Sequence, residues 1–308
     1  ESRGLGDVYK RQIQGNVPRM GLDFNAQQRA VLANHVESTK KVGEPVDIVV
    51  WPENSSDVNP FADKQARDLI EEAVEAVNAP VLVGTITRDE IGPRNTMVVF
   101  DPDLGTGEYH HKKYLQPFGE WIPFRSFFRL FSPYVDQAGN FKPGEGNGLV
   151  HMMAAQLGHP IAVGVATCYE VAFDAAYRDA VRDGAQVLTT PTNNATFGFT
   201  DMTYQQLAMS RFRAMELDRA VVVAATSGVS AIVAPDGTVR QETGIFTQDQ
   251  LVDTVPLKEG LTPAVNWGRR MEWGMSILGV LVLICAMFTR RKEERYAYSL
   301  TTVPARVR

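Results

Sequence analysis

Short apolar runs alternate with amphipathic segments over most of this chain. Runs rich in valine, isoleucine and alanine are typical of buried strands, whereas apolar residues at spacings of three and four are typical of helices. The predicted strands are 46–51, 80–86, 96–100, 160–163, 186–190, 220–226 and 230–234, and the predicted helices are 25–42, 61–77, 172–183 and 202–219. Alternating helices and apolar strands predict an α/β layered fold.

The last apolar segment has a different pattern. Residues 273–289 carry no charged side chain, and a segment of this length is at the short end of what crosses a membrane. We therefore predict a transmembrane helix at 273–289 and a basic cytoplasmic tail at 290–308, with the preceding domain on the outer or periplasmic face of the cell membrane. A buried core helix is the alternative. Tryptophans flank one edge of the segment and basic residues the other: Trp267, Trp273, Arg290, Arg291, Lys292 and Arg295.

The first twelve positions lack this periodicity. Residues 1–12 show no hydrophobic repeat, and the regular pattern begins at Ile13. We expect residues 1–12 to be foreign to the native protein, whose own sequence would then continue upstream of Ile13. The domain predicted by the pattern covers residues 13–262, which is long enough to bury a sizeable core.

Composition excludes some classes of protein. The chain has 308 residues and a formal net charge of −5, which argues against a nucleic-acid partner. The sequence contains no glycine-rich phosphate loop. It has two cysteines, Cys168 and Cys285, and the second lies in the terminal apolar segment, so the domain has no disulfide framework.

Cys168 is the first candidate for chemistry. It follows the apolar run 160–163, where a strand ends and the chain turns. A lone thiol in such a place can act as a nucleophile if a base and an oxyanion stabiliser lie nearby, and a small buried hydrophobe is the alternative. Two other segments favour the nucleophile. Glu53 follows a strand that a proline ends, and Lys112 and Glu120 lie in the loop after strand 96–100.

Glutamate, lysine and cysteine in this order and spacing resemble the carbon–nitrogen hydrolase (nitrilase) superfamily. The resemblance runs from about Ile13 to about Pro256 and implies a nitrilase-like α-β-β-α sandwich, followed here by the C-terminal transmembrane helix. It also implies that Glu53 is the general base, Lys112 the catalytic lysine and Cys168 the nucleophile.

Lys112 rather than Lys113 matches the superfamily pattern. That pattern has a lysine, any residue, usually a histidine and then a leucine, and the chain reads Lys112, Lys113, Tyr114 and Leu115. Tyrosine therefore stands where histidine is usual.

Four segments narrow the resemblance to the apolipoprotein N-acyltransferase family, namely 51–55, 117–123, 168–170 and 211–216. This resemblance implies that an acyl chain passes from a phospholipid to Cys168 as a thioester. The chain then passes to the N-terminal amine of a diacylglyceryl-cysteine in an apolipoprotein. No cofactor is implied, the membrane is a partner, and we expect a monomer. A nitrilase-type amidase and a catalytically inactive domain that binds lipoprotein or a partner remain as alternatives.

The proposed chemistry explains why these residue types are needed. A thiol with a pKa near 8.5 is mostly protonated at neutral pH, so Glu53 would take its proton. Lys112 can stabilise the thiolate and the tetrahedral oxyanion, and the backbone N–H of Tyr169 is a second oxyanion donor. By resemblance, Glu120 holds Lys112. Glu170 either orients the loop or is an ordinary structural acid.

The segment 118–134 is unusually rich in aromatic residues. The spacing of its phenylalanines from Phe124 to Phe131 predicts a short amphipathic helix. One interpretation is core packing. The other is an apolar arm at the membrane surface that admits an acyl chain. The residues expected on this route are Trp121, Phe127 and Phe128, with Arg125 and Arg129 toward lipid headgroups.

Two further groups of polar residues are of types that can bind a substrate or a metal ion. Asn193 follows strand 186–190 and either positions a substrate carbonyl or forms a turn. Asn194 and Thr196 stand where the family commonly has aspartate and tryptophan, a difference that bears on substrate preference. His110 and His111 are adjacent, so on an extended segment they point apart, and we predict no metal site.

Overall fold

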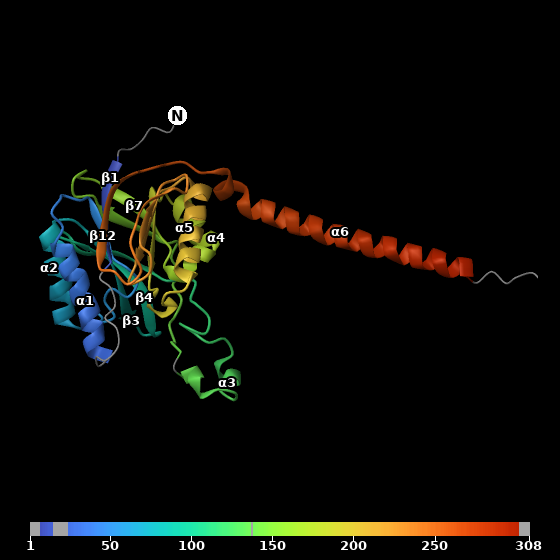
Figure 1. Cartoon of the computed structure of the whole chain (residues 1–308), viewed down its shortest axis with the longest axis horizontal. Coiled ribbons are helices and arrows are strands. Elements are labelled where there is room, and N and C mark those ends of the chain that lie inside the picture. The colour runs from blue at the N-terminus through green and yellow to red at the C-terminus, as the bar shows by residue number, and fades with distance from the viewer. Residues whose placement is uncertain (1–6, 15–23, 137, 302–308) are drawn as a thin grey trace, which may run out of the picture. The chain divides into compact units, whose positions relative to one another are not determined.

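The computed structural model describes residues 7–14, 24–136 and 138–301. The chain divides into two units, an α/β unit that ends at Thr262 and a helical unit that begins at Pro263. Figure 1 shows both units and labels their main helices and some of the strands.

Two six-stranded sheets form the centre of the first unit. The first sheet has the order β12-β1-β2-β3-β4-β5, in which β1–β2 and β2–β3 are parallel and the other pairs antiparallel. Its strands are β1 (Asp7–Gln14), β2 (Ile48–Val50), β3 (Val81–Arg88), β4 (Pro93–Asp101), β5 (Gly105–His111) and β12 (Asp249–Pro256).

The second sheet has the order β11-β10-β9-β8-β7-β6. Its central pairs β7–β8 and β8–β9 are parallel, and its outer pairs are antiparallel. Its strands are β6 (Leu149–Met153), β7 (Pro160–Val165), β8 (Val187–Thr192), β9 (Val221–Ala225), β10 (Ala231–Val233) and β11 (Val239–Glu242).

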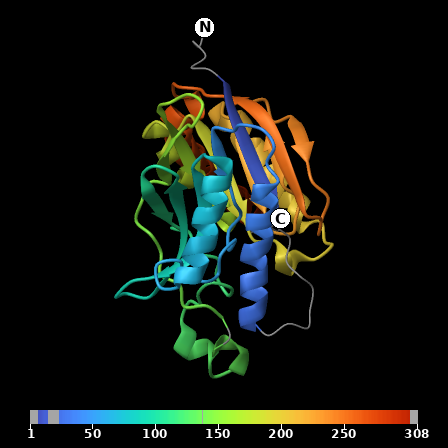
Figure 2. The same ribbon diagram turned by 90° about the vertical axis from the view of Figure 1, so that its left-hand side faces the viewer.

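Pairs of helices cover the outer faces of the two sheets. Helices α1 (Phe24–Lys40) and α2 (Lys64–Val77) lie side by side on the first sheet, as Figure 2 shows. Helices α4 (Asp174–Arg182) and α5 (Met202–Leu217) pack on the second sheet (Figure 1). Asp63 begins α2 as its N-cap, accepting the N–H of Ala66 at 2.9 Å, and Asn78 ends it in a left-handed conformation. The predicted α-β-β-α sandwich is confirmed.

Alternation along the strands divides the core into layers. In β2, Ile48 and Val50 pack between the sheets against residues such as Val163, while Val49 packs on the opposite face against the helices. Successive side chains of a strand point to opposite faces, so a strand buried on both faces reads as a continuous apolar run. Full burial of each such aliphatic side chain contributes roughly 1.5–3 kcal/mol.

Several strands lie where the sequence predicted none. Strand β5 is polar and forms an edge of the first sheet, and its first five residues are exposed. A strand exposed in this way lacks the apolar run on which the sequence prediction depended. Residues 7–12, expected to lie outside the native domain, pair within β1 with both β12 and β2. Strands β6, β11 and β12 were likewise not predicted.

The second unit is the long helix α6 (Pro263–Thr301). Its segment Pro263–Arg290 contains an 18-residue window with a mean hydropathy of 2.0 and is long and apolar enough to cross a membrane. The predicted span 273–289 lies within it. Every side chain from Met271 to Arg290 is exposed, so this apolar helix has a surface typical of a membrane-embedded or partner-bound segment.

Candidate active site

Loops after four strands bring the candidate catalytic residues together. Glu53 follows β2, Lys112 follows β5 directly, and Cys168 begins a 3-10 turn (Cys168–Ala172) just after β7. Asn193 follows β8 in the second sheet, and its backbone N–H donates to Oε2 of Glu53 at 2.8 Å. The site therefore lies at the ends of strands from both sheets, where ligands commonly bind in α/β folds.

Lys112 lies between two carboxylates. Its Nζ is 2.9 Å from Oε1 of Glu53 and 2.9 Å from Oε2 of Glu120. The amide of Asn95, on β4, donates to both acids, at 2.7 Å to Glu53 and 2.9 Å to Glu120. The backbone N–H of Gln116 also donates to Glu120, at 2.8 Å. This network fixes the position of the ammonium group, as the resemblance implied for Glu120.

The same network keeps Lys112 charged. Only 2 % of its side chain is exposed, and burial alone would lower its pKa. Glu53, the thiolate form of Cys168 and Glu120 together outweigh burial and raise the pKa of Lys112 above its usual value. A permanent cation therefore lies beside the thiol, where it can stabilise negative charge as that charge develops.

Cys168 is buried and has an uncommon backbone conformation. Its φ is 52°, in the left-handed region that a β-carbon disfavours, and such strain is concentrated at functional sites. Burial raises the pKa of the thiol to about 11, and Glu53 adds to the rise. Lys112 and a hydrogen bond with Thr192 oppose it. The thiol is therefore protonated at neutral pH and needs a base at the moment of attack.

Glu170 connects the two catalytic loops. Its Oε1 accepts the backbone N–H of Lys113 at 2.7 Å and of Tyr114 at 3.1 Å, directly after Lys112. Its Oε2 accepts the N–H of Thr167 at 2.7 Å, directly before Cys168. Of the two interpretations of this acid, the contacts favour the one in which it orients a loop.

His110 lies on the other side of this acid. Its Nε2 is 3.5 Å from Oε2 of Glu170, and both side chains are almost fully buried. Burial would raise the pKa of Glu170, but His110 and the N–H donors hold that pKa below its usual value. His111 instead contacts Oγ1 of Thr96 at 2.9 Å, so the two neighbouring histidines face apart.

Of the two interpretations of Asn193, its side-chain contacts fit the turn-forming one. Its Oδ1 accepts from Oγ1 of Thr226 at 3.0 Å and from the N–H of Ala195 at 3.2 Å, and its Nδ2 faces Asn54 at 3.4 Å. The side chain therefore supports the loop, whereas its backbone N–H holds Glu53, the candidate base.

Asn95 and His110 are site residues that the sequence reasoning missed. Both lie in strands, and their roles depend on which acids the fold places opposite them. For Asn95 the sequence offered one signal, its polarity. Asn95 lies just before an apolar run, at a place where a buried strand would ordinarily have an apolar residue.

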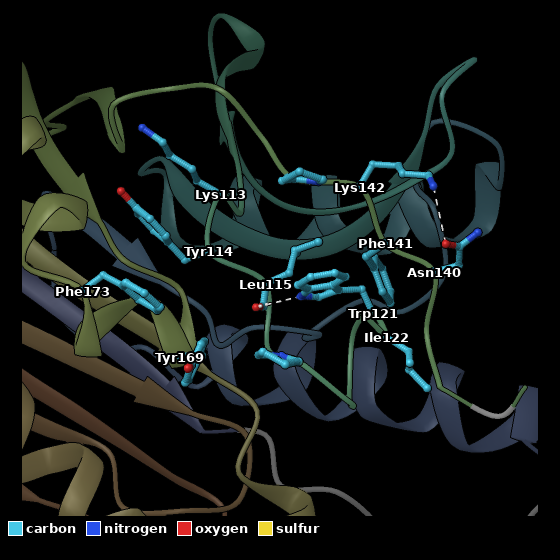
Figure 3. A pocket seen from close by; sticks show the side chains of 12 residues that line it. Lys113, Tyr114, Leu115, Trp121, Ile122, Asn140, Phe141, Lys142, Tyr169 and Phe173 are labelled. Carbon is cyan, nitrogen blue, oxygen red and sulfur yellow. Dashed lines mark hydrogen bonds between the residues drawn. The ribbon is translucent and has the colours of Figure 1, made fainter. Parts of the chain in front are cut away.

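An open pocket of about 540 Å³ adjoins this network (Figure 3). Three of its lining residues directly follow site residues in the sequence: Lys113 follows Lys112, Trp121 follows Glu120, and Tyr169 follows Cys168. Aromatic and aliphatic side chains form most of its wall. The rings of Tyr114 and Phe173 stack with their centres 4.4 Å apart, and Nε1 of Trp121 donates to the carbonyl of Leu115 at 3.3 Å.

The aromatic segment 118–134, called the arm below, exposes several of its rings. Phe124 is 83 % exposed, Phe127 56 % and Phe131 72 %, so the core-packing interpretation is wrong for these residues. The regular helix is shorter than predicted, because α3 covers only Arg125–Phe128. Phe128 is partly buried and packs edge-on against the rings of Phe118 and Phe127.

The two arginines of the arm differ from each other. The guanidinium of Arg125 donates to the carbonyls of Val135, Ala138 and Gly139, so it holds the arm together and does not face outward as expected. Arg129 is exposed and pairs with Asp136.

A buried cysteine beside a lysine and two glutamates, at the ends of facing sheets, defines a cysteine-dependent enzyme site of the nitrilase type. Residues 12–260 match the family model described as carbon-nitrogen hydrolase, and the chain belongs to that family. Solved structures support the same fold. A branch 10 member of the nitrilase superfamily from Saccharomyces cerevisiae superposes with a TM-score of 0.59 at 18 % identity, covering 87 % of this chain and 95 % of its own. An amidase from Nesterenkonia gives 0.57 at 17 % identity, covering 82 % and 92 %.

Curated relatives are more similar in sequence. The chain is 45 % identical over 92 % of its length to an apolipoprotein N-acyltransferase of Mycolicibacterium smegmatis, of which it covers 50 %. It is 33 % identical over 92 % of its length to the enzyme of the same name from Ralstonia nicotianae, of which it covers 53 %. The chain thus spans about half the length of these relatives.

Proposed function

We propose that this chain carries the catalytic domain of an N-acyltransferase that moves a fatty acyl group from a phospholipid to an apolipoprotein. The acceptor is the N-terminal amine of a diacylglyceryl-cysteine. The observation that carries the proposal is the placement of Lys112 at 2.9 Å from both Glu53 and Glu120, in a chain 45 % identical to an apolipoprotein N-acyltransferase.

In the first half-reaction, the sulfur of Cys168 attacks the carbonyl carbon of a phospholipid ester while Glu53 takes the thiol proton. The ammonium of Lys112 and the backbone N–H of Tyr169 stabilise the oxyanion that forms. The carbon–oxygen bond then breaks, and Glu53 returns the proton to the leaving lysophospholipid oxygen. The acyl group remains on Cys168 as a thioester.

In the second half-reaction, the acceptor amine attacks the thioester carbonyl and passes a proton to Glu53. The carbon–sulfur bond breaks, and the sulfur of Cys168 takes the proton from Glu53. An amide leaves and the thiol is restored, so the order of events is ping-pong. The raised pKa of the thiol fits this cycle, because the resting cysteine keeps its proton until Glu53 accepts it.

Two surfaces favour lipid over a small soluble amide as substrate. The arm exposes large aromatic side chains next to the pocket, and α6 has the length and hydropathy of a membrane span. An enzyme for small amides needs neither. We place the catalytic unit on the outer face of the membrane and the C-terminus in the cytoplasm, because basic residues follow the apolar segment. Trp121, Phe127 and Phe128 form the proposed lipid route.

Intact mass spectrometry of the membrane-purified chain, incubated with phospholipid alongside Cys168→Ala, tests the proposal. We expect an added acyl mass that hydroxylamine removes and that the variant lacks. Turnover of a short amide without an acyl adduct would support the amidase alternative. Absence of both signals would mean either that activity requires segments outside this chain, which covers 50 % of its Mycolicibacterium smegmatis relative, or that the chain only binds lipoprotein or a partner.

A further inference from the structure

The pocket in Figure 3 combines an apolar wall with two cationic groups at its edge. Lys113 and Lys142 line it, and both side chains are partly buried. Among the described residues, neither ammonium pairs with a carboxylate. Nζ of Lys142 has a long contact of 3.4 Å with Oδ1 of Asn140, and Nζ of Lys113 lies 5.7 Å from the centre of the Tyr114 ring.

Among the described residues, Lys40 pairs with Glu72, Lys64 with Asp68, and Lys258 with Asp218, whereas Lys41, away from this pocket, has no such ion pair. What distinguishes Lys113 and Lys142 is that they line the same pocket. Two lysines without such partners at the mouth of one pocket leave a local positive potential, which attracts an anionic ligand.

We propose that this pocket binds the donor lipid by its phosphate at Lys113 and Lys142 and by its fatty chain against the aromatic wall. The inference rests on the proposed function and names the part of the donor that the chain recognises. A volume of about 540 Å³ is typical of sites for small ligands, and a mostly apolar wall with a few polar groups is their usual composition. Ammonium groups bind phosphate as point charges.

The position of the pocket connects this recognition to the reacting atoms. Lys112 and Lys113 are adjacent, and the first points into the catalytic network while the second lines the pocket. Tyr169 lines the pocket next to the nucleophile. In a phospholipid, only a few bonds separate the phosphate from the ester carbonyl, so a phosphate held at the edge places the ester on the side of Cys168.

The apolar wall of the pocket favours a phospholipid over a free inorganic anion as its ligand. Phe141, Ile122, Trp121 and the stacked Tyr114–Phe173 pair offer apolar surface that inorganic phosphate cannot use. Each buried methylene of a chain contributes about 0.8 kcal/mol. A long-chain alkyl phosphate should therefore bind, whereas butyl phosphate should bind at least about a hundredfold more weakly.

Binding is measured by calorimetry on the Cys168→Ala chain in an uncharged detergent, with dodecyl phosphate as the probe. Lys113→Gln keeps the backbone N–H that binds Glu170 and removes only the side-chain charge. We expect Lys113→Gln and Lys142→Gln each to weaken binding about fivefold, and the double variant about 25-fold. Lys64→Gln, an exposed lysine on α2, is the matched control and should leave binding unchanged.

Equal binding of dodecyl phosphate to the double variant would overturn the inference, as would equally tight binding of inorganic phosphate or of dodecanol. Its failure is distinguishable from that of the proposed function. A thioester that forms equally well in the double variant at limiting phospholipid refutes only the lysine subsite. Lysine-dependent binding of dodecyl phosphate without any thioester on native Cys168 supports the subsite and refutes the acyltransferase.

Discussion

Nδ2 of Asn95 lies 2.7 Å from Oε1 of Glu53 and joins that acid to Glu120, to which it also donates at 2.9 Å. Both carboxylates also accept from Lys112, Glu53 through the same Oε1 and Glu120 through its other oxygen, Oε2. Two acids so close together repel each other, and the amide and the ammonium offset that repulsion. Asn95 therefore sets the spacing of Glu53, the proposed base, relative to Lys112, without contacting Cys168 in any described hydrogen bond.

Replacing Asn95 by leucine, which has a similar size but no donor, should slow thioester formation on Cys168 by about 10- to 100-fold, because hydrogen bonds to charged groups contribute roughly 1.5–3 kcal/mol. The rate is measured by mass spectrometry after mixing with phospholipid. Asn147→Ala, at an exposed site that contacts Asp183, is the control and should react at the parental rate. A parental rate in Asn95→Leu would show that Lys112 alone positions the base.

The reactivity of Cys168 should follow its raised pKa. In a Cys285→Ser background only one thiol remains, and its alkylation by iodoacetamide should rise with pH to a midpoint of about 11. Lys112→Met removes the nearby cation that lowers this pKa, so the midpoint should move higher still. A midpoint near 8.5, the value of an ordinary thiol, would contradict the burial argument.

Two of the three loops that carry the proposed catalytic residues could be placed because they follow apolar runs, whereas Lys112 follows the polar strand β5 and not, as expected, strand 96–100. Glu53 and Cys168 come after strands buried on both faces, and such strands are visible in a single sequence. Asn95 could not be assigned in this way, since its role depends on the distance between acids 42 and 25 positions away. A contact between residues so far apart in the sequence produces no repeating pattern of residue types from which it could be predicted.

The aromatic arm shows a second limit. The spacing from Phe124 to Phe131 predicted an apolar helical face, and the same spacing serves a buried core or a membrane surface equally well. Only the exposed fractions of these side chains exclude the buried core, and the membrane surface stays a prediction. The arginines were equally ambiguous, because an Arg125 that binds three carbonyls and an Arg129 that faces solvent have the same sequence context.

Asp57, four positions after Glu53, should make the free energy of unfolding depend on pH. Burial raises its pKa from 3.8 to about 6, the hydrogen bond from Asn54 opposes the rise, and Glu53 adds to it. The folded state therefore holds a proton that the unfolded state has released between pH 4 and 6, so stability falls as pH rises through this range.

Asp57→Asn removes that cost while it can still accept from Asn54. The variant should be more stable than the parent by about 1–3 kcal/mol at pH 7 and equally stable at pH 3.5, where both side chains are neutral. Urea unfolding at the two pH values measures the difference. A gain of the same size at both would point to packing instead of ionisation.

Gln12 and Gln14 offer a matched pair in β1. The amide of Gln12 is fully buried and has no hydrogen-bond partner within the part of the chain that the structure describes, and its neighbours across the sheet are Val50 and Leu251. Gln12→Leu should raise the free energy of unfolding by about 1–3 kcal/mol, because it removes an unsatisfied buried amide.

The side chain of Gln14 lies on the same face of β1 as that of Gln12, but its polar atoms have hydrogen-bond partners. It donates to the carbonyls of Gly244 and Thr247 at 3.2 and 2.8 Å. Gln14→Leu should therefore destabilise the fold by a similar amount, because it leaves buried partners unpaired. Chemical unfolding of both variants checks the pair, and stabilisation by both would mean that apolar content, not hydrogen bonding, decides the effect.

The exposed arm should matter for lipid but not for the thiol itself. Phe127→Asp replaces a ring that is 56 % exposed by a carboxylate, and Phe128→Asp replaces its partly buried neighbour in the same way. Each should lower acyl transfer from phospholipid vesicles by at least about tenfold, because a charge opposes insertion of an apolar surface into lipid. Alkylation of Cys168 by a small soluble reagent should stay at the parental rate. Leu104→Asp, 70 % exposed in the turn between β4 and β5, is the control and should change neither reaction. Equal loss of lipid activity and of alkylation would mean that the arm supports the folded site and does not serve as a lipid entrance.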